Sequence, residues 1–148
     1  MREHFIAYGF IHAGDIALDP AGVLRCNLLP AFLRRGEHHA HHGWVYLWSG
    51  VHADGVHEVF YVGKAGKALA DRCNQHLGGF GGGSKKGVRL AQHLREFFGG
   101  AAGRCVHVYA RKSPAATLLD EPDITLCEAE ERAMIAKMRR LGAMLWNA

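Results

Sequence analysis

The sequence lacks the features that mark several classes of protein. No apolar run approaches the roughly 18 residues of a membrane-spanning helix, and the N-terminal "MREHFIAYGF" lacks the long apolar stretch of a secretory signal. The four cysteines are scattered, without a C-x-x-C pair, which argues against a zinc ribbon or a disulfide scaffold. We therefore expect no membrane contact, a cytoplasmic location, and cysteines that serve as reduced core residues.

Acidic residues are scarce in one third of the chain. Between positions 64 and 95 only Asp71 is acidic, so this stretch carries a charge of +6, against +4 for the whole chain. A solvated surface is the ordinary explanation of such charges, but clustering of one sign is typical of a surface that binds a polyanion such as nucleic acid. The seven basic residues are Lys64, Lys67, Arg72, Lys85, Lys86, Arg89 and Arg95.

The remaining composition is that of one globular domain. A chain of 148 residues can bury a core without added cross-links, and 49% hydrophobic with 22% charged residues is ordinary for a folded protein. No internal repeat or linker divides the sequence. We therefore expect a single domain over residues 1–148.

Alternating and helical patterns predict the main elements. Two short strands flank a "DPAG" turn within 14–28, and two aromatic, β-branched strands at 44–50 and 57–64 flank an Asp-Gly turn. The later segments are predicted as a helix from Lys67, a flexible glycine-rich loop at 77–87, a helix at 88–98, a strand at 104–112 and a long helix at 123–142 ending at Gly142. This order predicts an α/β (α+β) fold, with a mostly antiparallel sheet flanked by helices.

The long predicted helix contains an unusual carboxylate. Glu131 lies seven residues after Ile124 and four before Ile135, within the apolar stripe of that helix. A carboxylate on this side is costly unless it is paired with an arginine or ligates a metal ion, and the sequence leaves both alternatives open.

A histidine cluster precedes the predicted strands. "EHHAHHG" places four histidines at His38, His39, His41 and His42. Clustered imidazoles can hold a transition metal, but no nearby cysteine or structured carboxylate completes a site, so a loop that binds metal incidentally is favoured.

The segment "FYVGKAGKALADRCNQH" at 60–76 combines a strand, a basic glycine turn and a helix. It is not a phosphate-binding P-loop, because only two residues separate Gly63 from Gly66 and Ala68 stands where a magnesium-binding hydroxyl is needed. It does place Arg72 and His76 one helical turn apart, on a predicted helix that follows the strand of Tyr61.

These fragments, taken in order, resemble the GIY-YIG nuclease family. "VYL" with Tyr46 stands at the first tripeptide and "YVG" with Tyr61 and Gly63 at the second, and the "YVGKA" form is closest to the restriction-enzyme-like branch. The resemblance covers 44–147, so that 1–43 forms an N-terminal extension with a short hairpin and the His-rich loop. It departs from the family at Trp44, in a longer hairpin, and in the absence of a proline before the final asparagine. The other matching residues are Arg72, His76, Glu131 and Asn147.

The resemblance implies a metal-dependent DNA endonuclease with one Mg²⁺ or Mn²⁺ per site. Glu131 would hold the ion, and Arg72 would contact the phosphate. Tyr46 would act as the general base, with Lys64 and His76 lowering its pKa and Tyr61 binding in the same cleft. The residues expected to bind DNA along its backbone are Lys67, Lys85, Lys86 and Arg89.

Two alternatives accompany this interpretation. One is a nucleic-acid-binding domain of the same fold without catalytic activity, and the other is a metal-handling protein built on the histidine cluster. Because the sequence ends one residue after Asn147, we expect no appended recognition domain, and cleavage of both strands would need two events or a homodimer.

Overall fold

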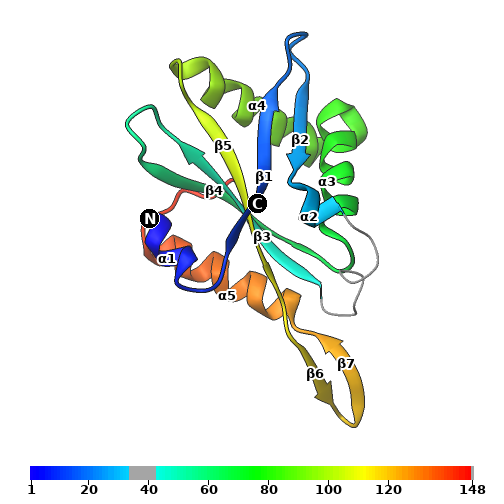
Figure 1. Cartoon of the computed structure of the whole chain (residues 1–148). Helices are drawn as coiled ribbons and strands as arrows, with labels where there is room; N and C mark the ends of the chain where they lie inside the picture. The colour runs from blue at the N-terminus through cyan, green and yellow to red at the C-terminus, as the bar shows by residue number, and fades with distance from the viewer. Residues whose placement is uncertain (34–42, 148) are drawn as a thin grey trace.

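A five-stranded antiparallel sheet with the strand order β2-β1-β5-β3-β4 forms the centre of the molecule (Figure 1). The computed structural model describes residues 1–33 and 43–147. The sheet and its flanking helices confirm the predicted α+β class. Its strands are β1 (Ile11–Leu18), β2 (Leu24–Leu28), β3 (Trp44–Val51), β4 (His57–Ala65) and β5 (Cys105–Lys112).

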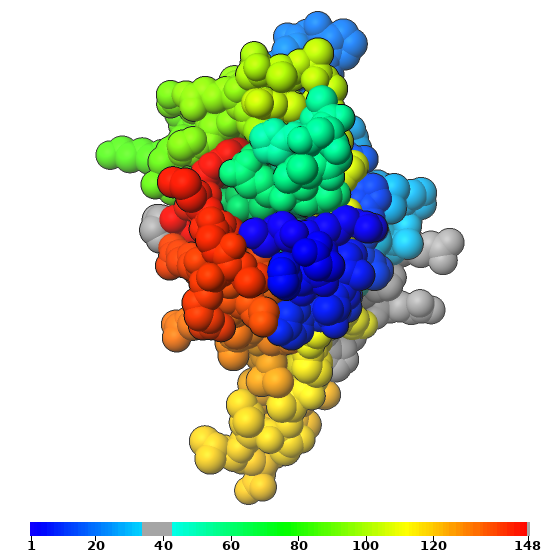
Figure 2. Space-filling view, turned by 90° about the vertical axis from the view of Figure 1, so that its left-hand side faces the viewer, coloured from blue at the N-terminus to red at the C-terminus, as the bar shows by residue number. Residues whose placement is uncertain are grey.

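Helices cover both faces of the sheet. On one face, α2 (Pro30–Leu33), α3 (Leu69–Gly78) and α4 (Lys85–Gly100) pack on a core that includes Trp44, Tyr46 and Trp48. On the other face, α1 (Arg2–Ile6) and α5 (Cys127–Arg140) pack on Val45 and Leu47, and the two helices lie side by side (Figure 2). Successive residues of β3 therefore contribute to opposite cores, as strand alternation requires.

The N-terminal strands belong to the same sheet as the rest. The expected hairpin is present, with Ile16 paired to Cys26, and β1 also pairs along β5, with Asp15 opposite His107. The segment 1–43 thus supplies two of the five strands within the described part of the chain. The histidine cluster at 38–42 lies outside the described residues.

The long helix begins later than predicted. Residues before Cys127 form a second hairpin, β6 (Ala115–Leu118) and β7 (Glu121–Thr125), which projects from the body (Figures 1 and 2). Leu119 and Asp120 both have positive φ, the geometry of a type I′ turn, but the pair lacks the usual Asn-Gly signal. Asp123 has φ 58°, which no helix accepts, so the predicted start at 123 is wrong.

The glycine-rich segment is mostly helical, in place of the predicted loop, with a break at Gly82. The segment η2 (Gly79–Gly83) connects α3 to α4, its Gly82 has a non-helical φ of 111°, and the Ser84 hydroxyl accepts a hydrogen bond of 2.9 Å from the Gly87 amide. A Cβ at Gly87 would lie 2.3 Å from the carbonyl carbon of Gly79. These glycines therefore allow two backbones to touch, which composition alone did not reveal.

Two of the cysteines are paired, contrary to the prediction. Cys26 on β2 and Cys73 on α3 form a disulfide, whereas Cys105 and Cys127 are free. The bonded cysteines are 47 positions apart and meet only through tertiary packing, so no local spacing indicated the bond. No helix among the described residues is long and apolar enough to cross a membrane.

Candidate active site

The two tyrosines project from neighbouring strands onto one face of the sheet. Tyr46 pairs with Gly63 and Trp48 pairs with Tyr61, so the tyrosine rings are diagonal neighbours with centroids 6.2 Å apart. A Cβ at Gly63 would lie 2.4 Å from the hydroxyl oxygen of Tyr46. Gly63 is therefore needed because the Tyr46 ring lies across it.

Helix α3 brings Arg72 and His76 to the Tyr46 hydroxyl. The Arg72 Nε donates to the Tyr46 oxygen at 3.2 Å, and the His76 Nε2 lies 2.5 Å from the same oxygen. Because the arginine is a donor, the tyrosine proton is free to point at His76, which accepts it. Gln75 fixes the arginine further by accepting from its Nη1 at 2.8 Å.

Burial sets the protonation of this group. It raises the pKa of Tyr46 above its ordinary value, Tyr61 raises it further, and Arg72 partly opposes the shift. Burial, reinforced by Arg72 and Lys86, lowers the pKa of His76 to about 3. At neutral pH the pair is thus a neutral phenol donating to a neutral imidazole.

A cleft of about 670 Å³ opens beside this group at the sheet edge formed by β4. Tyr61 lines it, whereas Tyr46 does not and is only 2% exposed, enclosed by Arg72 and His76. The polar and charged residues along the cleft are Tyr61, Lys64, Lys67, Asp71, Arg72, Gln75, Lys86, Glu131 and Asn147. It therefore collects most of the residues that the sequence singled out.

Glu131 also lines the cleft. It comes from α5, which covers the face of the sheet opposite to α3 and α4. Burial raises the pKa of its carboxyl, while Lys64, Lys86 and Arg72 lower it. The side chain is half-buried and not fully within the apolar stripe, and it forms no ion pair within residues 1–33 and 43–147. The ion pair with an arginine that the sequence allows for Glu131 is formed instead by its neighbour Glu130, which lies 2.6 Å from Arg111 in a partly exposed pair.

The cations occupy different positions around the cleft. Lys64 faces away from Tyr46 and pairs with Glu128 at 3.2 Å, so Arg72, and not Lys64, is the cation at the Tyr46 hydroxyl. Lys86 lies over the ring of Tyr61, 5.1 Å from its centroid. Lys67 lines the cleft beside it, and Lys85 and Arg89 are exposed on α4.

Asn147 attaches the C-terminal segment to the edge strand β4 through two hydrogen bonds. Its side-chain amide donates to the Val62 carbonyl at 2.7 Å and accepts from the Val62 amide at 3.0 Å. It thus pairs with β4 as a further peptide group would. Trp146, beside it, donates its backbone N–H to the Phe60 carbonyl and stacks on the Phe60 ring.

Sequence reasoning missed two supporting residues. Trp48 packs against both Tyr61 and His76, with ring centroids 4.6 and 4.8 Å away, and so fixes the positions of their rings. Gln75 holds Arg72 as described. The signals were present, since Trp48 is two positions after Tyr46 on a strand and Gln75 three after Arg72 on a helix.

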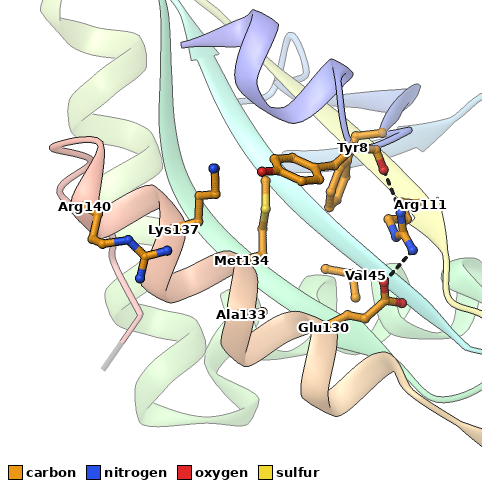
Figure 3. A pocket seen from close by; sticks show the side chains of 9 residues that line it. Tyr8, Val45, Arg111, Glu130, Ala133, Met134, Lys137 and Arg140 are labelled. Carbon is orange, nitrogen blue, oxygen red and sulfur yellow. Dashed lines mark hydrogen bonds and ion pairs between the residues drawn. The ribbon is translucent and has the colours of Figure 1, made fainter.

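A second hollow of about 400 Å³ lies between α5 and the turn after α1 (Figure 3). Arg111 crosses its wall, bonding to the Tyr8 carbonyl at 2.8 Å and to Glu130. On the same wall, the Lys137 ammonium lies over the Tyr8 ring, 5.0 Å from its centroid, in a cation–π contact. The sequence-predicted site residues do not line this hollow.

Two solved structures have a similar fold. A mutant of EndoII from bacteriophage T4 matches with a TM-score of 0.64 at 21% identity, covering 94% of this chain and 95% of that one. The restriction endonuclease HPY188I in complex with product DNA matches with a TM-score of 0.51 at 14% identity, covering 94% and 79%. No protein-family model and no curated protein sequence matches the chain. The two similarities show a fold shared with these proteins.

Proposed function

We propose that this protein is a metal-dependent DNA endonuclease of the GIY-YIG type. The observation that carries the proposal is the Tyr46 hydroxyl, held between a donor, Arg72, and an acceptor, His76, behind a basic cleft. A fold shared with a restriction endonuclease bound to product DNA supports the same conclusion.

Tyr46 is the general base in this proposal. A water that enters from the cleft past Arg72 gives its proton to the tyrosine oxygen, whose own proton passes to His76 Nε2. In the free protein this transfer is uphill, because the pKa of Tyr46 is raised and that of His76 lowered. A bound phosphate beside Arg72 and Lys86 would neutralise the cations that depress the His76 pKa, and so favour the transfer when substrate is present.

Arg72 contacts the scissile phosphate. It lines the cleft, and the N–H groups not used by Tyr46 and Gln75 remain for the phosphate oxygens. Its fixed position matters, since a preorganised donor stabilises charge that develops during the reaction without reorganisation.

Glu131 fits one Mg²⁺ or Mn²⁺. Its half-buried carboxylate faces the cleft without an ion pair among the described residues, and a single carboxylate with waters and phosphate oxygens satisfies the octahedral preference of Mg²⁺. When bound, such an ion would supply neutralisation of the phosphate charge and stabilisation of the leaving oxygen. Within the described part of the chain, the cleft does not collect the several bridging carboxylates of a two-metal site.

DNA lies along the cleft and α4 in this proposal. Lys67 and Lys86 border the cleft, and Lys85 and Arg89 extend the basic surface along the helix. With one site per chain, a monomer nicks one strand, and cleavage of both strands in one event requires a homodimer. A cytoplasmic location fits this function. Of the two grounds given for that location, the lack of a secretory signal remains, whereas the Cys26–Cys73 disulfide contradicts the expectation of reduced cysteines.

The test is cleavage of supercoiled plasmid with Mg²⁺ or Mn²⁺ by the wild type and by Glu131→Gln. We expect nicked product from the wild type, none from the variant, and DNA affinities within a few-fold of each other. Glu128→Gln is the matched control, because Glu128 lies on the same helix but pairs with Lys64. This control variant should cleave as the wild type does.

Two outcomes contradict the proposal. Full cleavage by Glu131→Gln removes Glu131 as the metal ligand. DNA binding without cleavage by the wild type under any divalent ion favours the alternative, a nucleic-acid-binding domain of the same fold without catalytic activity.

A further inference from the structure

A group of polar side chains on the other face of the sheet takes no part in the proposed cleavage. His12 and Asp15 come from β1, and His107 comes from β5, where it pairs with Asp15. Residues three apart on a regular strand point to opposite faces, but the register shifts between His12 and Gly14. This bulge returns His12 to the face of Asp15.

The two imidazoles converge on one carboxylate oxygen. His12 Nε2 lies 3.0 Å from the Asp15 Oδ1, and His107 Nδ1 hydrogen-bonds to the same oxygen. The three ligand atoms lie within 4.8 Å of one another, and the two rings meet edge to face. All three side chains are partly exposed, so an ion and its water can reach them.

We propose that His12, Asp15 and His107 form a site for one divalent transition metal, with Zn²⁺ as the preferred ion and water as the remaining ligand. Two imidazole nitrogens and a carboxylate are the donor set of zinc sites that keep an open position. Donors on one zinc lie roughly 3.3 Å apart, since zinc–ligand distances are about 2.0–2.2 Å, so small side-chain shifts suffice. The nitrogen donors disfavour Mg²⁺, which takes oxygen ligands.

The second nitrogen of His107 already has a neighbour. Cys105 Sγ lies 3.7 Å from His107 Nε2 on the same strand. Metal-bound imidazoles usually have such a partner on the nitrogen that does not bind the ion, and it fixes the ring orientation.

The site's position gives it a structural role. An ion there ties β1 to the central strand β5, and the β1–β2 hairpin is joined to α3 through Cys26 and Cys73. Ile16, the residue after Asp15, faces the opposite core that contains Tyr46. The ion is therefore separated from the cleft by the sheet, and it stabilises the N-terminal hairpin without entering the cleavage reaction.

The experiment must first remove a competing ligand. A background variant in which His38, His39, His41 and His42 are all replaced by Ser eliminates the histidine cluster of the sequence. In metal-stripped protein of this background, we expect Zn²⁺ to bind one to one by calorimetry, and Co²⁺ to give the visible absorption of a four-coordinate site. At a hundredfold excess over Kd, Zn²⁺ should raise Tm by about 5 °C or more.

Substitutions in the same background locate the ion. Asp15→Asn keeps a hydrogen-bond acceptor but removes the charge, and His107→Gln removes a nitrogen ligand; each should weaken Zn²⁺ binding roughly 100-fold. His93→Gln is the control, because His93 stacks on Trp146 away from the site, and its affinity should be unchanged.

The proposal is overturned if the background variant shows neither one-to-one Zn²⁺ binding nor a Co²⁺ spectrum. That outcome needs no ligand substitution and so does not depend on how the variants fold. Equal Zn²⁺ affinity in Asp15→Asn, His107→Gln and His93→Gln, with circular dichroism showing all three folded, overturns it equally.

Discussion

On the face covered by α3 and α4, Tyr46 and His76 are sealed in a core of aromatic rings, whereas on the opposite face His12, Asp15 and His107 remain partly exposed. Both groups hold imidazoles against an oxygen at hydrogen-bond distance. Enclosure makes the difference, because burial shifts the pKa values of Tyr46 and His76 far from those in water. The enclosed group is suited to moving a proton, and the open one to accepting an ion.

The largest expected effect is on the free energy of unfolding at acidic pH, which depends on the burial of His76. The pKa of His76 is lowered to about 3, so at mildly acidic pH this histidine is protonated in the unfolded chain and neutral in the folded one. Its contribution to stability is complete above the ordinary pKa of about 6.5 and is lost as the pH falls toward 3. We expect this one group to cost about 3 kcal/mol between pH 7 and pH 4.

Urea unfolding of the wild type and of His76→Gln at pH 7 and pH 4 measures this effect. The variant cannot titrate at this position, so its unfolding free energy should fall less over the same interval. If the two proteins lose stability in parallel, His76 is not the enclosed group that we describe.

The next effect separates the two tyrosines. Tyr46→Phe keeps the ring and removes the hydroxyl, and we expect a rate of plasmid nicking lower by roughly 10². Tyr61→Phe should cost less, because Tyr61 lines the cleft, whereas the Tyr46 hydroxyl bonds to both Arg72 and His76. Because the relay runs from a neutral phenol to a neutral imidazole, and the pKa of His76 is lowered to about 3, the wild-type rate should change little through the neutral range; a rise of about tenfold per pH unit would mean instead that ionised Tyr46 is the base.

Normal cleavage by Tyr46→Phe together with an inactive Tyr61→Phe would reverse the assignment of the two residues. Both variants should bind DNA as the wild type does, since Arg72 and Glu131 are unchanged.

The smallest expected effect compares basic residues on the two sides of the molecule. Replacing Lys85, Lys86 and Arg89 on α4 by Ala should weaken DNA binding about tenfold and flatten the slope of log K against log salt by roughly 2–3. The matched control replaces Lys137, Arg139 and Arg140 on α5, which removes the same charge from the opposite side. Equal losses from both triple variants would mean that net charge, and not the α4 surface, governs binding.

Local patterns predicted the parts of the site that lie close together in the sequence. Tyr46 and Tyr61 follow from the strand hairpin, and Arg72 and His76 from one helical turn, so the structure brings these four together. The position of Lys64 was predicted wrongly beside Tyr46. Three positions separate it from Tyr61, and strand alternation places the two on opposite faces.

The remaining features depend on contacts that no local pattern records. The pairing of β1 with β5 joins segments about 90 positions apart, and the Cys26–Cys73 bond depends on that packing. The β6–β7 hairpin was missed because a Leu-Asp turn carries a weak signal, and this error moved the predicted start of α5. The same error placed Ile124 in the helix stripe, whereas it lies on β7.

The C-terminal segment covers part of the exposed edge of the sheet at β4. A terminal strand offers unpaired peptide groups, and a long hydrophobic one invites strands of other molecules to add to it, which leads to aggregation. On β4, Asn147 occupies both the donor and the acceptor of Val62, and Trp146 occupies the carbonyl of Phe60. Two residues thus mask the middle of the border strand against self-association, while the cleft beside it stays open to a substrate.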